Sequence, residues 1–126
     1  YTTDTTKFGD THTKFGLRPT WGMSQTLSRA VGQRRARELS FTAKIFTGAQ
    51  AAEWGIANDS FETPEALDEA LAATCAQITA NSPEAVAAMK DLYRLAENEE
   101  GIRASLKAET SSQYSISDTE ERLSAF

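Results

Sequence analysis

Residues 8–25 read F-G-D-T-H-T-K-F-G-L-R-P-T-W-G-M-S-Q, and the rest of the chain is best understood from this stretch. It is broken by three glycines and one proline, which are Gly9, Gly16, Gly22 and Pro19. Helices and strands of ordinary length do not fit between such breaks, so we predict two short extended pieces and a tight loop. The loop leads into a helix that starts at Trp21 or Gly22. Loops that enter helix N-termini often carry binding sites, because the first backbone N–H groups have no partner inside the helix.

The composition is that of a small globular protein. The chain has 126 residues, of which 40% are hydrophobic and 25% charged, with a formal net charge of −5. This charge argues against a nucleic-acid binder and against a protein that binds anionic membranes. Residues 1–62 carry eight Lys/Arg and six Asp/Glu, whereas residues 63–126 carry five and twelve. Any polyanion binding would therefore belong to the first half.

Cysteine usage and the chain ends bear on the compartment. Cys75 is the single cysteine, which fits a reducing compartment such as the cytoplasm, and its helical apolar surroundings predict an inert buried thiol. No apolar run approaches about 18 residues, so we expect no membrane-spanning helix. We find no signal peptide. The chain begins with Tyr1 and a Thr-rich, strand-like run, which is typical of the middle of a protein.

Two helices follow the opening stretch. Apolar residues at helical spacing predict the first, with Gly32 as its stop; these residues are Met23, Leu27, Ala30 and Val31. A second helix is predicted over residues 33–41, with Ala36, Leu39 and Ser40 facing inward. Its basic cluster of Arg34, Arg35 and Arg37 is either a phosphate-binding group or a solvated helix face whose side chains point in different directions.

The chain between residues 42 and 62 is predicted to contain short elements. An extended link over residues 42–48 precedes a short helix that Gly55 closes, and a short strand follows at residues 56–61. Trp54 either stacks on a ligand or packs at the helix end.

From Thr63 onward the pattern is helical. Thr63 and Ser82 are predicted caps, each followed by a proline in the first turn. The inward positions are Leu67, Leu71, Cys75 and Ile78 in the first helix, and Val86, Met89, Tyr93 and Ala96 in the second. A third helix is predicted to carry Ile102, Leu106 and Tyr114, and a capping box over residues 117–120 starts a last helix with Leu123 and Phe126. These stripes are narrow, so we expect another segment or subunit to cover part of them.

Three features together resemble the C-terminal half of the crotonase (enoyl-CoA hydratase/isomerase) superfamily. Residues 8–25 are similar to the family's Phe-Gly-x-Pro-Glu and Gly-Leu-x-Pro-x-x-Gly pattern. Residues 27–58 follow its register of Val-Gly, Ala-x-Glu-Leu, Ala-x-Glu-Ala and Gly-Leu-Val-Asn. The helical tail carries N-S-P-E-A at residues 81–85 and S-D-T-E-E-R-L-S-A-F at residues 117–126.

The resemblance implies an α/β crotonase fold with a ββα spiral. Residues 1–62 would be the end of the spiral core with part of the acyl-CoA pocket, and residues 63–126 a helical region for trimer or hexamer assembly. The implied substrates are acyl-CoA thioesters, with two backbone N–H groups stabilising an enolate oxygen. Those donors, and one hydratase glutamate, lie in the family's N-terminal half, so that half is an expected partner. Coenzyme A enters as part of the substrate, and we expect no other cofactor and no metal.

The resemblance also points to His12 and Asp10 as catalytic candidates. The glutamate of the family's Pro-Glu pair falls on His12, and this departure puts ordinary hydration in question. An imidazole can still position water or move a proton near neutral pH. Asp10 would point the same way as His12 if this piece is extended, and would either orient the imidazole or act as the carboxylate itself. His12 could instead be structural.

Further residues correspond to the substrate pocket. Thr20, Trp21 and Gly22 fall on the loop near the reacting end of the acyl group, where Trp21 would narrow the pocket or simply cover the helix start. Phe15 corresponds to an apolar position of the acyl pocket. Phe126 corresponds to an aromatic residue that touches the coenzyme A of a neighbouring subunit.

Two other functions fit the sequence. One is a crotonase-fold subunit that binds acyl-CoA or serves in assembly without catalysis, which the replacement of glutamate by His12 would suit. The other is an unrelated helical interaction domain, which the amphipathic tail alone would permit.

Overall fold

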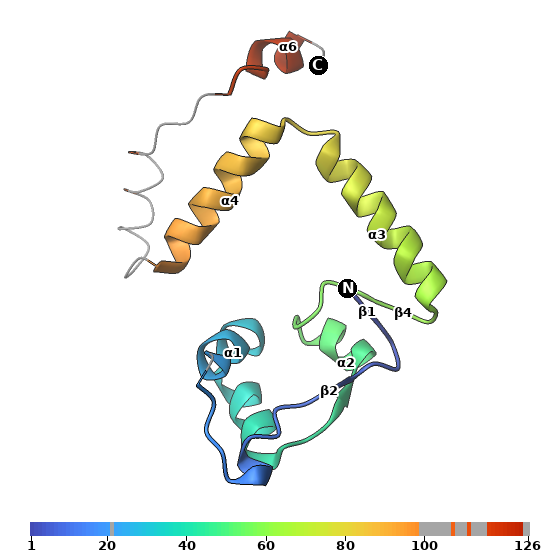
Figure 1. Cartoon of the computed structure of the whole chain (residues 1–126), viewed down its shortest axis with the longest axis vertical. Coiled ribbons are helices and arrows are strands. Elements are labelled where there is room, and N and C mark those ends of the chain that lie inside the picture. The colour runs from blue at the N-terminus through green and yellow to red at the C-terminus, as the bar shows by residue number, and fades with distance from the viewer. Residues whose placement is uncertain (21, 99–106, 108–110, 112–115, 125–126) are drawn as a thin grey trace. The chain divides into compact units, whose positions relative to one another are not determined.

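The computed structural model describes residues 1–20, 22–98, 107, 111 and 116–124. The chain divides into two compact units, Tyr1–Ala72 and Ala73–Phe126 (Figure 1). The elements in chain order are β1 (Thr2–Thr3), β2 (Lys7–Phe8), the 3-10 helix η1 (Thr13–Phe15), α1 (Met23–Thr42), β3 (Phe46–Thr47), α2 (Gly48–Glu53), β4 (Ser60–Phe61), α3 (Pro64–Thr79), α4 (Pro83–Asn98) and α6 (Thr119–Ser124). The structure is therefore a mostly helical α/β protein. The predicted division into a pocket region and an assembly region at residue 62 stays a prediction.

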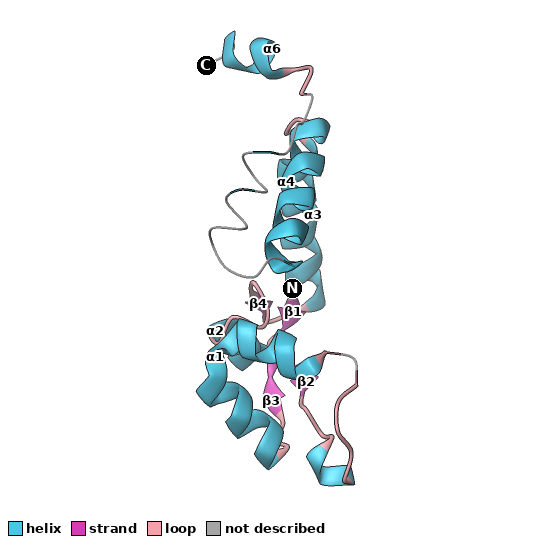
Figure 2. Ribbon diagram, turned by 90° about the vertical axis from the view of Figure 1, so that its left-hand side faces the viewer, coloured by secondary structure: helices cyan, strands magenta, loops and turns pink. Residues whose placement is uncertain are grey.

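Short strand pairs join distant parts of the first unit. Strand β1 runs parallel to β4, with Thr2 opposite Ser60, and β2 runs antiparallel to β3, with Phe8 opposite Phe46 (Figure 2). Helix α2 follows β3 directly and packs against the strands. The Thr-rich opening run thus holds both ends of the segment formed by β3, α2 and β4.

An aromatic stack forms the core of the first unit. Phe46 is 5% exposed, and its ring centroid lies 5.6 Å from that of Phe8 and 5.3 Å from that of Trp54. Leu39 and Ala51 complete the buried cluster. The guanidinium carbon of Arg35 lies 4.4 Å from the centroid of the Trp54 ring, a cation–π contact. Trp54 therefore packs, as one of the two interpretations predicted, while Arg34 and Arg37 are exposed.

Helix α1 consists of two helical segments that meet at Gly32. This glycine has φ 76° and ψ 161°, a conformation that residues with a Cβ rarely adopt. The stop predicted at Gly32 is confirmed, and so are the buried Ala36 and Leu39 in the second segment. In the first segment Met23, Leu27 and Val31 are half-buried, whereas Ala30 is exposed.

Helix α2 begins with a complete capping box. The Thr47 hydroxyl accepts from the N–H of Gln50, and the Gln50 side chain accepts from the N–H of Thr47. Gly55, at φ 80°, closes the helix as predicted. Gly48 is buried at the point where α2 meets β1, and a Cβ added there would overlap the carbonyl oxygen of Thr3.

The caps of the later helices are confirmed. The hydroxyls of Thr63 and Ser82 accept from the N–H groups of Ala66 at 3.2 Å and Ala85 at 3.4 Å. The capping box predicted over residues 117–120 requires Glu120 to bind the N–H of Ser117. That N–H donates instead to the Glu84 carboxylate at 2.6 Å, which ties the start of α6 to α4. The helix predicted around residue 102 and the side chains of Leu123 and Phe126 lie outside the described residues.

The predicted inward stripes of α3 and α4 are largely exposed. Four of their large side chains are between 44% and 67% exposed: Leu71, Ile78, Met89 and Tyr93. Cys75 is exposed as well, so the prediction of a buried thiol was wrong. The physical reason is that α1, α2 and the short strands supply the buried cluster of the described residues, to which α3 contributes no side chain. Among the described residues, no helix combines the length and apolarity needed to cross a membrane.

We predict that Gly48→Ala destabilises the protein by about 3 kcal/mol, because the new methyl group meets backbone that must move rather than a side chain that can turn. The free energy of unfolding from urea titration measures this. Gly16→Ala is the matched control: Gly16 has φ 65° and open space around it, so the expected cost is about 1 kcal/mol from backbone strain alone. Equal costs for the two variants would contradict the steric explanation.

Candidate functional site

A turn, not an extended piece, brings Asp10 and His12 together. His12 has φ −54° and ψ −49°, which is helical, and its backbone N–H donates to the Asp10 carboxylate at 3.3 Å. This is an Asx turn, in which an aspartate side chain accepts from the backbone two residues later. The His12 carbonyl then accepts from the N–H groups of Phe15 and Leu17, which closes η1. The expectation that an extended backbone would align the two side chains was wrong in its geometry, although the side chains do meet.

The two side chains make a short contact. His12 Nδ1 lies 2.6 Å from Asp10 Oδ1, with the Asp10 side chain 5% and the His12 side chain 27% exposed. An ionised carboxylate can only accept, so Nδ1 carries the proton and donates. In the neutral ring, Nε2 is then left with a lone pair. The arrangement leaves a proton acceptor at Nε2, the ring nitrogen that does not contact Asp10.

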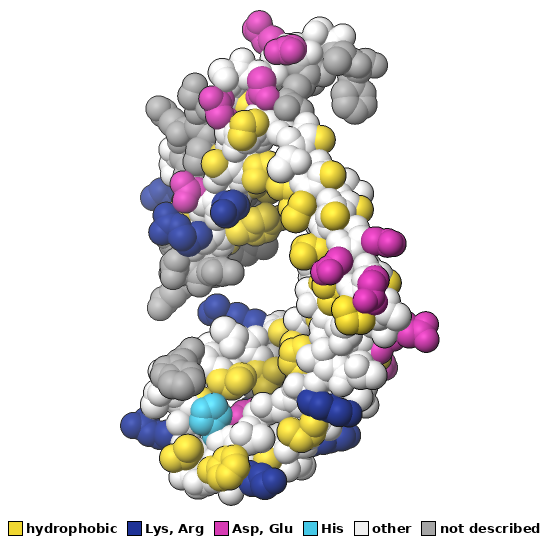
Figure 3. Space-filling model, turned by 45° about the vertical axis from the view of Figure 1, so that its right-hand side comes forward, with side chains coloured by type: hydrophobic (Ala, Val, Ile, Leu, Met, Phe, Trp, Pro, Cys, Tyr) yellow, Lys and Arg dark blue, Asp and Glu magenta, His cyan; other side chains and the backbone are white. Residues whose placement is uncertain are grey.

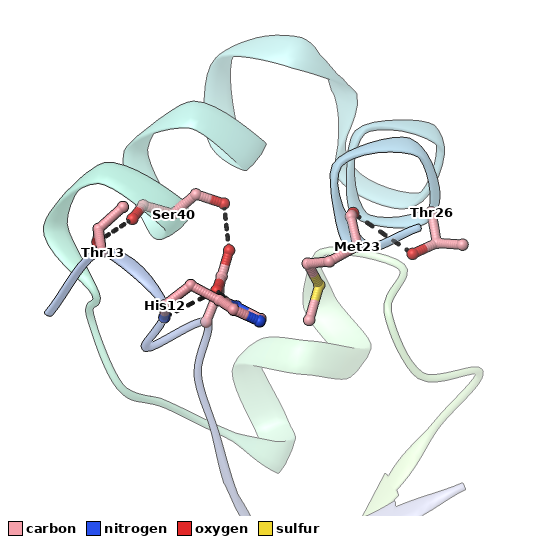
Figure 4. A network of polar contacts seen from close by, with 6 residues as sticks. His12, Thr13, Met23, Thr26 and Ser40 are labelled. Carbon is pink, nitrogen blue, oxygen red and sulfur yellow. Dashed lines mark hydrogen bonds and ion pairs between the residues drawn. The ribbon is translucent and has the colours of Figure 1, made fainter. Parts of the chain in front are cut away.

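Ser40 connects this pair to α1. Its hydroxyl donates to the second carboxylate oxygen, Asp10 Oδ2, at 2.6 Å, and its carbonyl accepts from the Thr13 hydroxyl, also at 2.6 Å (Figure 4). Figure 4 also shows that the His12 ring extends from this network toward Met23. Both oxygens of Asp10 are therefore occupied, and the imidazole is the end of the network that faces away from Ser40.

The network keeps Asp10 ionised. Burial by itself raises the pKa of Asp10, but the hydrogen bonds from Ser40 and His12 and the attraction of His12 together outweigh it. The pKa of the carboxyl therefore lies below its ordinary value of 3.8. Asp10 is a fixed negative charge at neutral pH.

His12 borders two adjoining pockets in the first unit. The larger, of about 310 Å³, has apolar walls from Leu27, Ala36 and Phe41. The smaller, of about 210 Å³, is lined by His12, Pro19, Met23 and Thr26. The histidine, cyan in Figure 3, reaches the surface among hydrophobic side chains. Arg37 also lines the larger pocket.

The other predicted site residues either do not line the two pockets beside His12 or lie outside the described residues. Phe15, in η1, is 68% exposed and does not line either pocket beside His12. Thr20 is exposed in the loop. Gly22 is the N-cap of α1 at φ 86°, with its carbonyl accepting from Gln25 and Thr26. Trp21 and Phe126 lie outside the described residues.

Several residues of the site were not anticipated. Ser40 was predicted only as an inward position, and Pro19, Leu27 and Phe41 had no predicted part in a pocket. The inward register of Ala36, Leu39 and Ser40 was the one sequence signal available. It could not identify a contact with a residue 30 positions away. Within the described ranges, no three His, Cys, Asp or Glu side chains are grouped to hold a metal ion.

Several proteins named as enoyl-CoA hydratases are similar to this chain. A curated protein of Arabidopsis thaliana, named as a probable peroxisomal enoyl-CoA hydratase, is 47% identical over 64 residues, which are 51% of this chain and 24% of that protein. The enoyl-CoA hydratase subunit I of Geobacillus kaustophilus superposes with a TM-score of 0.82 at 23% identity, over 98% of this chain and 49% of that one. At this identity the similarity establishes a shared fold.

A third similar protein, from Thermobifida fusca, was crystallised in complex with acetoacetyl-CoA. It has a TM-score of 0.75 at 27% identity, covering 98% of this chain and 46% of that chain. The chain spans about a quarter to a half of the length of the curated relatives that it matches. The family model described as enoyl-CoA hydratase/isomerase matches residues 1–126. The chain therefore belongs to the enoyl-CoA hydratase/isomerase family, within the crotonase superfamily.

Proposed function

We propose that the protein containing this chain acts on acyl-CoA thioesters as a hydratase or isomerase, with His12 as its proton carrier. Family membership supports the general class of reaction. The Thermobifida fusca relative, crystallised with acetoacetyl-CoA, supports the class of substrate. The observation that carries the proposal is the 2.6 Å contact between His12 Nδ1 and Asp10 Oδ1 beside two pockets.

The geometry suits an imidazole that exchanges protons through Nε2. With Nδ1 engaged by Asp10, Nε2 is the nitrogen available to water or substrate. In hydration, Nε2 accepts a proton from water as the water oxygen bonds to the β-carbon of the enoyl group. The electron pair of the double bond moves toward the thioester oxygen and gives an enolate. The enolate then re-forms the thioester carbonyl as its α-carbon takes the proton held on Nε2, which completes the addition. In isomerisation the same nitrogen takes a proton from one carbon and returns it to another.

The thioester oxygen needs separate stabilisation as it gains charge. In the proposed mechanism two backbone N–H groups supply it, and we place them in the segment that corresponds to the family's N-terminal half. The described residues of this chain contribute the proton carrier and pocket walls.

Asp10 acts in this proposal by orienting the imidazole. Its two oxygens are taken by His12 and Ser40, and it is 5% exposed, so it has no oxygen directed at a substrate. The alternative, in which Asp10 itself replaces the family glutamate, would require at least one of these hydrogen bonds to break. A fixed carboxylate that binds the far nitrogen of a histidine also stabilises the imidazolium that forms during proton transfer.

We also propose that residues 1–62 end a ββα spiral and that residues 63–126 serve in trimer or hexamer assembly. The exposure of Leu71, Ile78, Met89 and Tyr93 supports the second part, because monomers rarely leave several large apolar side chains of neighbouring helices in water. Their coverage by another subunit would remove this exposure.

We predict that His12→Ala lowers kcat for hydration or isomerisation of short enoyl-CoA substrates about a hundredfold, because general acid–base groups contribute on that order. Steady-state kinetics of the purified protein measure this. Lys14→Ala is the control, since Lys14 lies in the same turn, is exposed and borders neither pocket beside His12. A rate within twofold of wild type for His12→Ala would reject the role. Acyl-CoA binding without turnover by the wild type would indicate the non-catalytic subunit instead.

We predict that Asp10→Asn destabilises the protein in a pH-dependent way. The folded-state pKa of Asp10 lies below 3.8, so ionised Asp10 stabilises the fold above that pH and loses its contribution as pH falls through the folded pKa. Near neutral pH the free energy of unfolding of the wild type should be about 2 kcal/mol larger than that of Asp10→Asn, because hydrogen bonds to a charged group contribute on that order. The difference should shrink below pH 3.8. Urea titrations across this range test it, and a constant difference would contradict an ionised Asp10.

A further inference from the structure

Ser40 holds the chain on both sides of His12. Through its hydroxyl it binds Asp10, two residues before the histidine, and through its carbonyl it binds Thr13, the next residue after it. Both distances are 2.6 Å. Ser40 lies near the end of α1, beside Leu39, which is 1% exposed in the core. The hydroxyl that reaches Asp10 is therefore carried by a well-packed part of the helix.

We propose that Ser40 is a positioning residue for the reaction, which fixes the tautomer and direction of the His12 imidazole by way of Asp10. This inference rests on the proposed function, in which His12 carries the proton. It extends that function to a residue of α1 that acts on the imidazole by way of Asp10.

The geometry explains why a second hydrogen bond on Asp10 matters. A carboxylate bound only at Oδ1 can rotate partway about its bond to Cβ, which would leave Nδ1 with a less fixed acceptor. With Oδ2 bound by Ser40, the plane of the carboxylate is set and Oδ1 stays at Nδ1. The tautomer of a histidine is decided by the hydrogen bond made by its far nitrogen. Partners of this kind, one contact removed from the reacting group, typically contribute tenfold or more to activity.

The charges around the pair are few. Within the described residues, the titratable or charged groups that line the larger pocket beside Asp10 are His12 and Arg37. Arg37 stands one turn before Ser40 on the same helix and lines the pocket rather than binding Asp10. Replacing Ser40 by a neutral residue leaves Asp10, His12 and Arg37 in place, so its effect isolates the hydrogen bond from Ser40 to Asp10.

The test compares Ser40→Ala with Ser40→Thr, which keeps a hydroxyl, and with Thr42→Ala as the matched control. The Thr42 hydroxyl donates only to its own helix, to the Glu38 carbonyl at 2.7 Å, and Thr42 lies outside both pockets beside His12. The first readout is the nitrogen-15 NMR spectrum of the His12 ring, recorded over a range of pH so that the signals of the neutral ring are identified directly. The signals are assigned by their loss in His12→Gln. The second readout is kcat and KM measured separately.

We expect wild type, Ser40→Thr and Thr42→Ala to show the Nδ1–H tautomer. Ser40→Ala should show a mixture of tautomers and a kcat about tenfold lower, with KM within twofold. An unchanged tautomer and rate in Ser40→Ala would overturn the proposal. If Ser40→Ala does not fold, Ser40→Cys replaces it, because a thiol of similar size donates only weakly.

The two readouts separate this inference from the proposed function. The tautomer is measured without substrate, so a mixture in Ser40→Ala supports the positioning role even if His12→Ala keeps full activity and the catalytic proposal fails. Conversely, if His12→Ala loses activity while Ser40→Ala keeps the Nδ1–H tautomer, the function stands and the role of Ser40 is rejected.

Discussion

A charged carboxylate enclosed by protein needs a hydrogen-bond donor at each oxygen, and Asp10 meets this requirement in a way that shapes the whole site. Its donors come from the turn that it starts, through the backbone and ring of His12, and from Ser40 on α1. Satisfying one buried group therefore bends the chain into a turn, sets the imidazole and attaches the loop to a helix. All three effects follow from the free-energy cost of burying the Asp10 charge away from water.

The loop that carries Asp10 and His12 is attached to the core through Phe8, which packs against the buried cluster. Phe8 packs on Phe46, Phe46 packs on Trp54, and Arg35 lies over Trp54. This row of contacts runs from β2 through β3 and α2 to the second segment of α1, which also carries Ser40. Asp10 and its serine donor are thus attached to the same packed unit from two directions. The short distances in the network rest on that shared support.

The sequence predicted best what adjacent residues determine. Gly32 and Gly55 end helical segments, and Thr63 and Ser82 cap the starts of α3 and α4. These features could be predicted because they act within one turn of the chain. Burial was predicted less well, since the stripe with Leu71 and Cys75 depends on what covers it. His12 could be singled out from a family register, and Asp10 from its position two residues before the histidine. The bond from Ser40, however, joins residues 30 positions apart and left no local pattern.

The break at Gly32 separates α1 into two segments that make different contacts. The first segment presents Leu27 to the larger pocket, while the second presents Ala36 and holds Asp10 through Ser40. Because the regular helix is interrupted between them, the part of the pocket wall that precedes Gly32 belongs to a different helical segment from the serine that binds Asp10. Substitutions before Gly32 can therefore reshape one side of the cavity while the helical turn that carries Ser40 keeps its own sequence.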